Sequence, residues 1–203
     1  MNLSPYLTAN TGIDALTHAI EAFVSRSAHP VSDLYARQAI ALVNKYLRRA
    51  VLAGNDLEAR TGMALASNLA GIAIAYAGVG AAHGLGMAVG GIGNKDHGVA
   101  VGIALPKVIE FNLPANLEKF REIAELLGEN TQGLSLREGA KLAAQAVRNL
   151  MTDLQLPLTY NEIGIGPELL TALVDDTKTQ RAMLNNPRRA TEEEIKELYK
   201  DLI

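Results

Sequence analysis

The chain has 203 residues, a formal net charge of −3 and an apolar share of 48%, which together suit one sizeable domain or two small ones with a real core. The slight negative charge argues against nucleic acid or an anionic membrane surface as a partner. The absence of cysteine excludes disulfide bonds, thiolate metal ligands and cysteine nucleophiles, and it is compatible with a cytoplasmic protein, as is the lack of a recognisable signal peptide at the start.

The composition predicts an all-α protein. Aromatic residues make up only 4% of the chain and tryptophan is absent, so alanine, leucine, isoleucine and glycine supply most of the apolar share. That mixture favours closely packed helices over a β-sandwich. We therefore expect a helical bundle over residues 1–203. The predicted helices cover about 11–25, 30–53, 56–77, 81–89, 98–112, 117–127, 135–154, 167–175 and 191–202.

Several residues mark where these helices begin, end or bend. Asn10 or Thr11 is the expected N-cap of the first helix. The glycine-rich stretch 90–94 is expected to form a loop, and Pro106 is expected to kink or break the helix that contains it. The last helix opens with a Thr-Glu-Glu-Glu capping box at Thr191.

Residues 61–94 contain no charged side chain, which raises the question of a membrane span. The run holds Asn68, His83 and many glycines, and it lacks the dense leucine, isoleucine and phenylalanine of a typical span. We therefore predict a buried central pair of helices, in which small residues let the backbones approach closely.

The first residues with possible chemistry are Asp14 and His18, in the segment TGIDALTHAIE. Their i, i+4 spacing places both side chains on one face of a helix, one turn apart. A carboxylate and an imidazole so placed can bind one divalent ion, or they can form an ordinary surface hydrogen bond.

Two further histidines, His83 and His97, lie next to Gly84 and Gly98 in the most apolar stretch of the chain. Each could be a core histidine bonded to backbone carbonyls, because buried ring nitrogens need partners. The glycines also fit a site where the backbone passes close to another group. Three imidazoles and one carboxylate would suit Fe(II), Zn(II) or Mn(II) without choosing among them.

These segments resemble the C-terminal half of the iron-containing (group III) alcohol dehydrogenases. TGIDALTHAIEAFVS is similar to the family's first C-terminal signature, and AAHGLGMAVGGIGNKDHGVAVGIALPKVIEFN is similar to its second. The ending that starts at Asn186-Pro187-Arg188 is similar too. The resemblance implies the helical C-terminal domain of the dehydroquinate synthase-like fold and an Fe(II) site, with Zn(II) or Mn(II) as alternatives. The implied metal ligands are Asp14, His18, His83 and His97.

One departure from the family concerns Met87. Many members have a further histidine at this position, near the nicotinamide and the substrate, whereas methionine cannot carry a proton. The catalytic residues therefore stay unassigned, and core filling is the expected role of Met87. The fourth histidine, His29, is expected to be exposed and without function.

A second departure concerns length, because family members are about twice as long. Their N-terminal half is a Rossmann-like domain, but only 13 residues precede Asp14 here, and no glycine-rich dinucleotide fingerprint follows a predicted strand. We expect that the cofactor-binding domain is absent, so NAD(P) would bind only together with a separate N-terminal half. The chain would then be a domain fragment, the product of a split gene, or one half of a two-chain enzyme.

The resemblance implies a partial dehydrogenase that interconverts small alcohols and aldehydes or ketones and is inactive alone. One alternative is a non-catalytic metal-binding module. Another is a related enzyme of the glycerol dehydrogenase or dehydroquinate synthase type. A surface that normally faces another domain should expose an apolar patch, and a homo-oligomer could cover it.

Overall fold

The computed structural model describes residues 3–203, and no strand occurs in that part of the chain. This confirms the predicted all-α class. Four short 3-10 turns accompany the α-helices. The α-helices are α1 (Pro5–Val24), α2 (Pro30–Leu52), α3 (Leu57–Ala77), α4 (Ala81–Gly93), α5 (His97–Asn112), α6 (Leu117–Leu126), α7 (Leu136–Asp153), α8 (Leu170–Thr179) and α9 (Glu192–Lys200).

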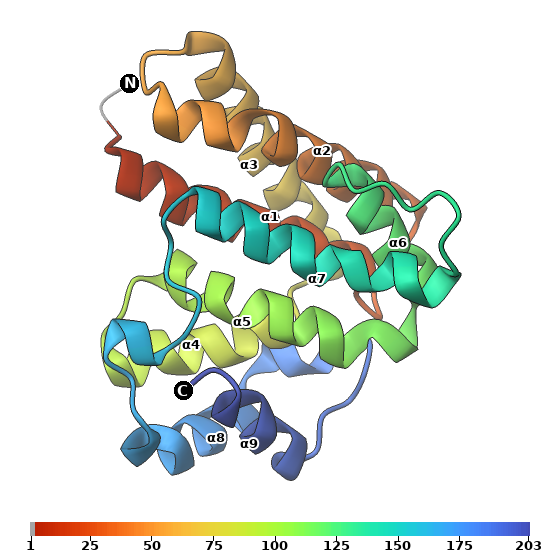
Figure 1. The fold of residues 1–203 in the computed structure, drawn as a ribbon. Coiled ribbons are helices and arrows are strands. Elements are labelled where there is room, and N and C mark those ends of the chain that lie inside the picture. Colours follow the sequence, from red (N-terminus) through yellow and green to blue (C-terminus); the bar gives the residue numbers. More distant parts are fainter. Residues whose placement is uncertain (1–2) are drawn as a thin grey trace.

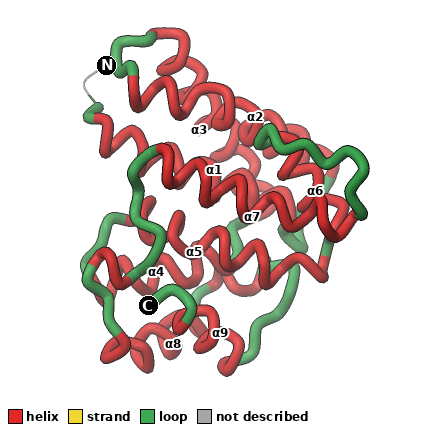
Figure 2. Tube along the Cα trace, viewed as in Figure 1, coloured by secondary structure: helices red, strands yellow, loops and turns green. Residues whose placement is uncertain are grey.

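Helix α5 lies at the centre of the bundle (Figure 1). Helices α1, α4 and α7 pack against it, and α2 and α3 pack on the other side of α1. Helices α6 and α7 form a hairpin, and α8 and α9 pack together at the opposite end of the molecule from α2 and α3 (Figure 2). Twelve of the 16 residues of α5 are buried, because neighbouring helices surround it.

Helix α1 begins earlier than predicted. Ser4 is its N-cap, where the side chain accepts a hydrogen bond from the backbone N–H of Leu7, and Pro5 occupies the first turn. Serine followed by proline is a strong start signal for a helix. The predicted cap at Asn10 or Thr11 is therefore wrong, and Asn10 is instead a buried residue inside the helix.

The predicted loop at 90–94 and a break at Pro106 are both absent. Helix α4 continues through the predicted loop to Gly93 and ends at Asn94, which adopts the left-handed conformation. Helix α5 continues through Pro106, which is buried within it. A proline costs a helix one hydrogen bond, but packing on several sides of α5 holds the helical path. By contrast, the capping box at Thr191 is present as predicted.

The uncharged stretch divides between two different environments. Helix α4 is largely buried, as predicted, but α3 buries only a stripe of small residues and leaves an apolar surface exposed. The buried residues of α3 are Ala59, Gly62, Ala66, Ala70, Ala73 and Ala77. Its exposed large apolar side chains are Leu57, Leu65 and Tyr76. The prediction of a wholly buried pair was therefore wrong for α3.

By length and composition, residues 97–115 could cross a membrane, but 72% of that window is buried inside the bundle, as in a core helix. Helices α3 and α4 pass the same test only as a pair, and the chain bends by 105° between them.

Candidate metal centre

Three helices bring the predicted ligands together. Asp14 and His18 lie one turn apart in the middle of α1, His83 lies in the first turn of α4, and His97 is the first residue of α5. The histidines at the N-terminal ends of α4 and α5 therefore both lie beside the carboxylate of Asp14.

The distances fit a shared cation. The Nε2 atoms of His83 and His97 each lie 3.6 Å from Oδ1 of Asp14. The ligand atoms of these three residues all lie within 4.8 Å of one another. Tetrahedral ligands with bonds near 2.1 Å to one ion would be separated by about 3.4 Å. The three side chains therefore stand close to the spacing that a single divalent ion requires.

Two atoms of this group lack any hydrogen-bond partner among the described residues. They are Oδ1 of Asp14 and Nε2 of His83, both buried. A buried polar atom without a partner is costly, and one cation between them would satisfy both. The residues present thus fit a metal ion on the evidence of their own unsatisfied atoms.

His18 stands apart from the other three. Its Nδ1 lies 3.9 Å from Oδ2 of Asp14, and its ring stacks on the ring of His83, with centroids 4.5 Å apart and an angle of 21° between planes. His18 is not among the three residues whose ligand atoms converge, so its ligation and the full four-ligand set stay predictions.

Glu21 also belongs to the cluster, although it was not among the residues predicted from the sequence, and its carboxylate contacts the His83 ring. Its side chain is 3% exposed, and its Oε2 lies 2.6 Å from Nδ1 of His83. Its Oε1 accepts hydrogen bonds from the backbone N–H groups of Ala82 and His83, at 2.6 and 3.4 Å. The signal was available, because Glu21 is the only charged residue in the apolar segment 19–24, and a buried charge needs partners.

A second buried group, Asn186, also caps α4. Its Oδ1 accepts a hydrogen bond from the backbone N–H of Ala81 at 3.1 Å and another from Asn112 at 2.9 Å. Its Nδ2 donates to Oδ1 of Asn112 at 2.8 Å. The N-cap of α4 is Gly80, which has no side chain, and a Cβ there would stand 3.0 Å from Oδ1 of Asn186 and 3.1 Å from Oε1 of Glu21. Glycine thus makes room for two caps from distant segments.

The Asn186 segment is itself fixed to α5 and α9 by Arg188. The guanidinium of Arg188 donates to the backbone oxygen of Phe111 at 3.0 Å and lies over the Phe111 ring. It also pairs with Glu194 in the first turn of α9. The Asn-Pro-Arg motif thus ties the C-terminal segment to the helix that begins with His97.

The electrostatics of the cluster follow from its carboxylates. Burial alone would lower the pKa of His83, but Glu21 and Asp14 outweigh burial and raise that pKa to about 9. Burial lowers the pKa of His18. Burial would raise the pKa of Asp14, but the nearby imidazoles of His83, His18 and His97 hold it below its usual value. Asp14 is therefore ionised and ready to bind a cation.

The outer side of the cluster is open. The side chain of His97 is 50% exposed and that of Met87 is 44% exposed. Core filling was thus the wrong role for Met87, because its position on α4 faces outward.

His29 is half-buried rather than exposed. It is the N-cap of α2, where its backbone N–H donates to Ser32, and its ring contacts Tyr76 edge to face.

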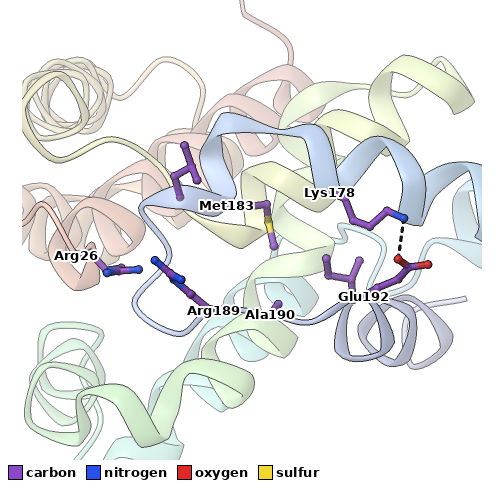
Figure 3. A pocket seen from close by; sticks show the side chains of 8 residues that line it. Arg26, Lys178, Met183, Arg189, Ala190 and Glu192 are labelled. Atoms are coloured by element: carbon purple, nitrogen blue, oxygen red, sulfur yellow. Dashed lines mark hydrogen bonds and ion pairs between the residues drawn. The ribbon is translucent and has the colours of Figure 1, made fainter.

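A cavity of about 510 Å³ lies elsewhere, between the α8–α9 end and the start of the loop after α1. Arg26 and Arg189 extend toward each other at one end of it, and Lys178 pairs with Glu192 at the other (Figure 3). None of the four predicted ligands lines this cavity.

The helical fold and the candidate metal cluster are the features of a helical domain that could bind a metal ion. The family model of the Fe-containing alcohol dehydrogenases, C-terminal, matches residues 8–203. The chain therefore belongs to the Fe-containing alcohol dehydrogenase family and corresponds to its C-terminal helical domain.

Relatives and solved structures agree with this assignment. The chain is 43% identical over 194 residues to 1,3-propanediol dehydrogenase of Citrobacter freundii, covering 96% of this chain and 50% of the relative. It is 41% identical to NAD-dependent methanol dehydrogenase of Bacillus methanolicus over 97% of this chain and 52% of the relative. The crystal structure of a 1,3-propanediol oxidoreductase superposes with a TM-score of 0.98 at 40% identity, covering all of this chain and 53% of that one. The chain spans about half the length of the curated relatives it matches.

Proposed function

We propose that this chain is the metal- and substrate-binding half of an NAD(P)-dependent alcohol dehydrogenase that interconverts small alcohols with aldehydes or ketones. Family membership supports the reaction class. The observation that carries the proposal is the pair of buried unsatisfied atoms, Oδ1 of Asp14 and Nε2 of His83, with His97 beside them.

Asp14, His83 and His97, joined by His18, would hold the ion, with Fe(II) the expected metal and Zn(II) or Mn(II) as alternatives. When bound, a divalent ion supplies a Lewis acid that stabilises developing negative charge on an alcohol oxygen. The open side of the cluster, between His97 and Met87, is where a small alcohol could approach.

The protein's own contribution to proton transfer is limited at this side. The thioether of Met87 neither donates nor accepts a proton in water, so the proton of the alcohol would leave through water or another group. The nicotinamide would be provided by a Rossmann-like part that residues 3–203, which contain no strand, do not supply.

The test is an activity assay of the purified, Fe(II)-loaded chain with NAD or NADP and a panel of short alcohols. It is run alone and after mixing with a separately expressed N-terminal half of the Citrobacter freundii enzyme, with that complete enzyme as positive control. We expect negligible turnover alone and measurable turnover in the mixture. Robust turnover by the chain alone would refute the need for a second half.

A non-catalytic metal-binding module is a second candidate, because Met87 replaces the family histidine. A Met87→His variant separates the two in the same mixture. Turnover that rises with the variant favours the dehydrogenase with an impaired proton path. If the wild-type chain and the variant both bind metal but show no turnover in any mixture, the result favours the non-catalytic metal-binding module.

A further inference from the structure

We propose that Glu21 is a positioning residue that sets the tautomer and the orientation of the His83 ring, so that Nε2 is free to bind the metal. This inference rests on the proposed metal site. Glu21 touches neither the metal position nor the substrate side, and it would act only through His83.

The two nitrogens of the His83 ring face two different carboxylates. Nδ1 lies 2.6 Å from Oε2 of Glu21, whereas Nε2 lies 3.6 Å from Oδ1 of Asp14. An ionised carboxylate only accepts hydrogen bonds, and an imidazole that binds a metal is neutral and carries one proton on its other nitrogen. The short contact with Glu21 therefore places that proton on Nδ1. The lone pair of Nε2 is then directed at the position shared with Asp14 and His97.

Both oxygens of Glu21 are held, so its position is fixed. Oε1 accepts from the backbone of Ala82 at 2.6 Å while Oε2 contacts the ring, and the side chain is 3% exposed. The ring of His83 and the first turn of its own helix are thus fixed by one carboxylate. With a divalent ion bound, the charges of Asp14 and Glu21 sum with it to zero, so the buried group carries no net charge.

A purely structural role would make Glu21 only a cap of α4. Glutamine separates this role from ring positioning. Its amide oxygen can still accept from the backbone of Ala82, but this puts its NH2 group against Nδ1 of His83. A donor at that place requires Nδ1 to be the acceptor, so the ring proton moves to Nε2, where it blocks the metal. Glu21→Gln therefore keeps the cap of α4 and reverses the tautomer of the His83 ring.

The experiment compares wild type with Glu21→Gln, and uses Glu122→Gln as the matched control. Glu122 is a partly exposed carboxylate that pairs with Arg37. Zinc affinity is measured by competition with a chelator, the His83 tautomer by ¹⁵N NMR of the imidazoles, and helix content by circular dichroism. For Glu21→Gln we expect native helix content, a zinc affinity lower by about 10- to 100-fold, and a ring proton on Nε2 in the zinc-free protein at mildly alkaline pH.

Wild type and Glu122→Gln should share one zinc affinity, with the proton on Nδ1 of His83 in the zinc form. A Glu21→Gln chain that binds zinc as tightly as wild type would overturn the inference. So would zinc bound through Nδ1 in the wild type, a result that can be read even if the variant fails to fold. Failure of the wild type to bind any metal would instead refute the proposed function.

Discussion

The inner side of the metal cluster, around His83, is buried and each of its supports is paired, whereas the outer side, around His97, is half-exposed and bordered by Met87. Glu21 holds the inner ring, and Asn186 shares the capping of the same helix. The contrast suggests a division of labour in which the inner side fixes where the ion sits and the outer side leaves room for exchangeable ligands.

The largest expected effect comes from removing the inner ligand. His83→Ala should lower metal affinity by more than about 100-fold, beyond the range of about 10- to 100-fold for loss of an outer-shell partner. His97→Ala should cost less, because water can take the place of an exposed ligand. Elemental analysis and chelator competition measure both, with His29→Ala as a histidine control outside the cluster. Equal losses of metal affinity in the two variants would contradict the distinction between the buried inner side and the open outer side.

The next effect is a pH dependence of stability in the metal-free chain. Folding raises the pKa of His83 from about 6.5 to about 9, so the folded state holds the proton more tightly. The resulting stabilisation is complete below pH 6.5 and is lost as the pH rises to about 9, with a size of about 3 kcal/mol. Urea unfolding at several pH values, with His83→Gln as control, measures it. Stability that rises across this window would mean that the folded ring is neutral.

The capping of the inner side can be tested at Asn186. Asn186→Ala leaves the backbone N–H of Ala81 and the amide of Asn112 without partners, so the free energy of unfolding should fall by about 2 to 3 kcal/mol. Asn149→Ala removes an exposed amide on α7 and should change it by no more than about 0.5 kcal/mol. Chemical denaturation compares the two variants. Similar values would show that the buried pair contributes little.

A smaller effect is expected on the outer side, at Gly98. A Cβ there would stand 2.3 Å from the backbone oxygen of Asn10, so Gly98→Ala should displace His97, weaken metal binding and cost about 1 to 3 kcal/mol of stability. Gly91→Ala, on α4, meets nothing within 4 Å and should stabilise its helix by up to about 1 kcal/mol. Thermal unfolding measures both variants, and we expect lower stability for Gly98→Ala and higher stability for Gly91→Ala. A Gly98→Ala variant with unchanged stability and metal affinity would show that α5 can shift freely.

Much of the fold could be predicted from the sequence, because helices such as α6, α7 and α9 carry clear periodic apolar faces and, in α7 and α9, capping boxes. Local signals failed where tertiary packing decided the outcome. At the end of α4, Gly93 allows a close contact rather than a loop, since a Cβ there would meet Ile165 at 2.3 Å. The path of α5 through Pro106 is likewise held by its neighbours.

The candidate site divides in the same way. The i, i+4 spacing placed Asp14 and His18 on one face, and the resemblance to the family supplied His83 and His97. The roles of Glu21 and Asn186 depend on contacts between residues 61 and 105 positions apart, which a single sequence does not reveal. A buried carboxylate in an apolar helix was the one available clue, and it indicated a partner without naming it.

The cap that Asn186 provides has a consequence for the order of events during synthesis. Asp14, His18, His83 and His97 leave the ribosome about 90 residues or more before Asn186 does. Until that last segment arrives, the first turn of α4 keeps one N–H group unpaired, and His83 is held by α1 alone. Firm capture of the ion would then wait for the Asn186 segment, and a protease that removed this segment would weaken the site without touching a ligand.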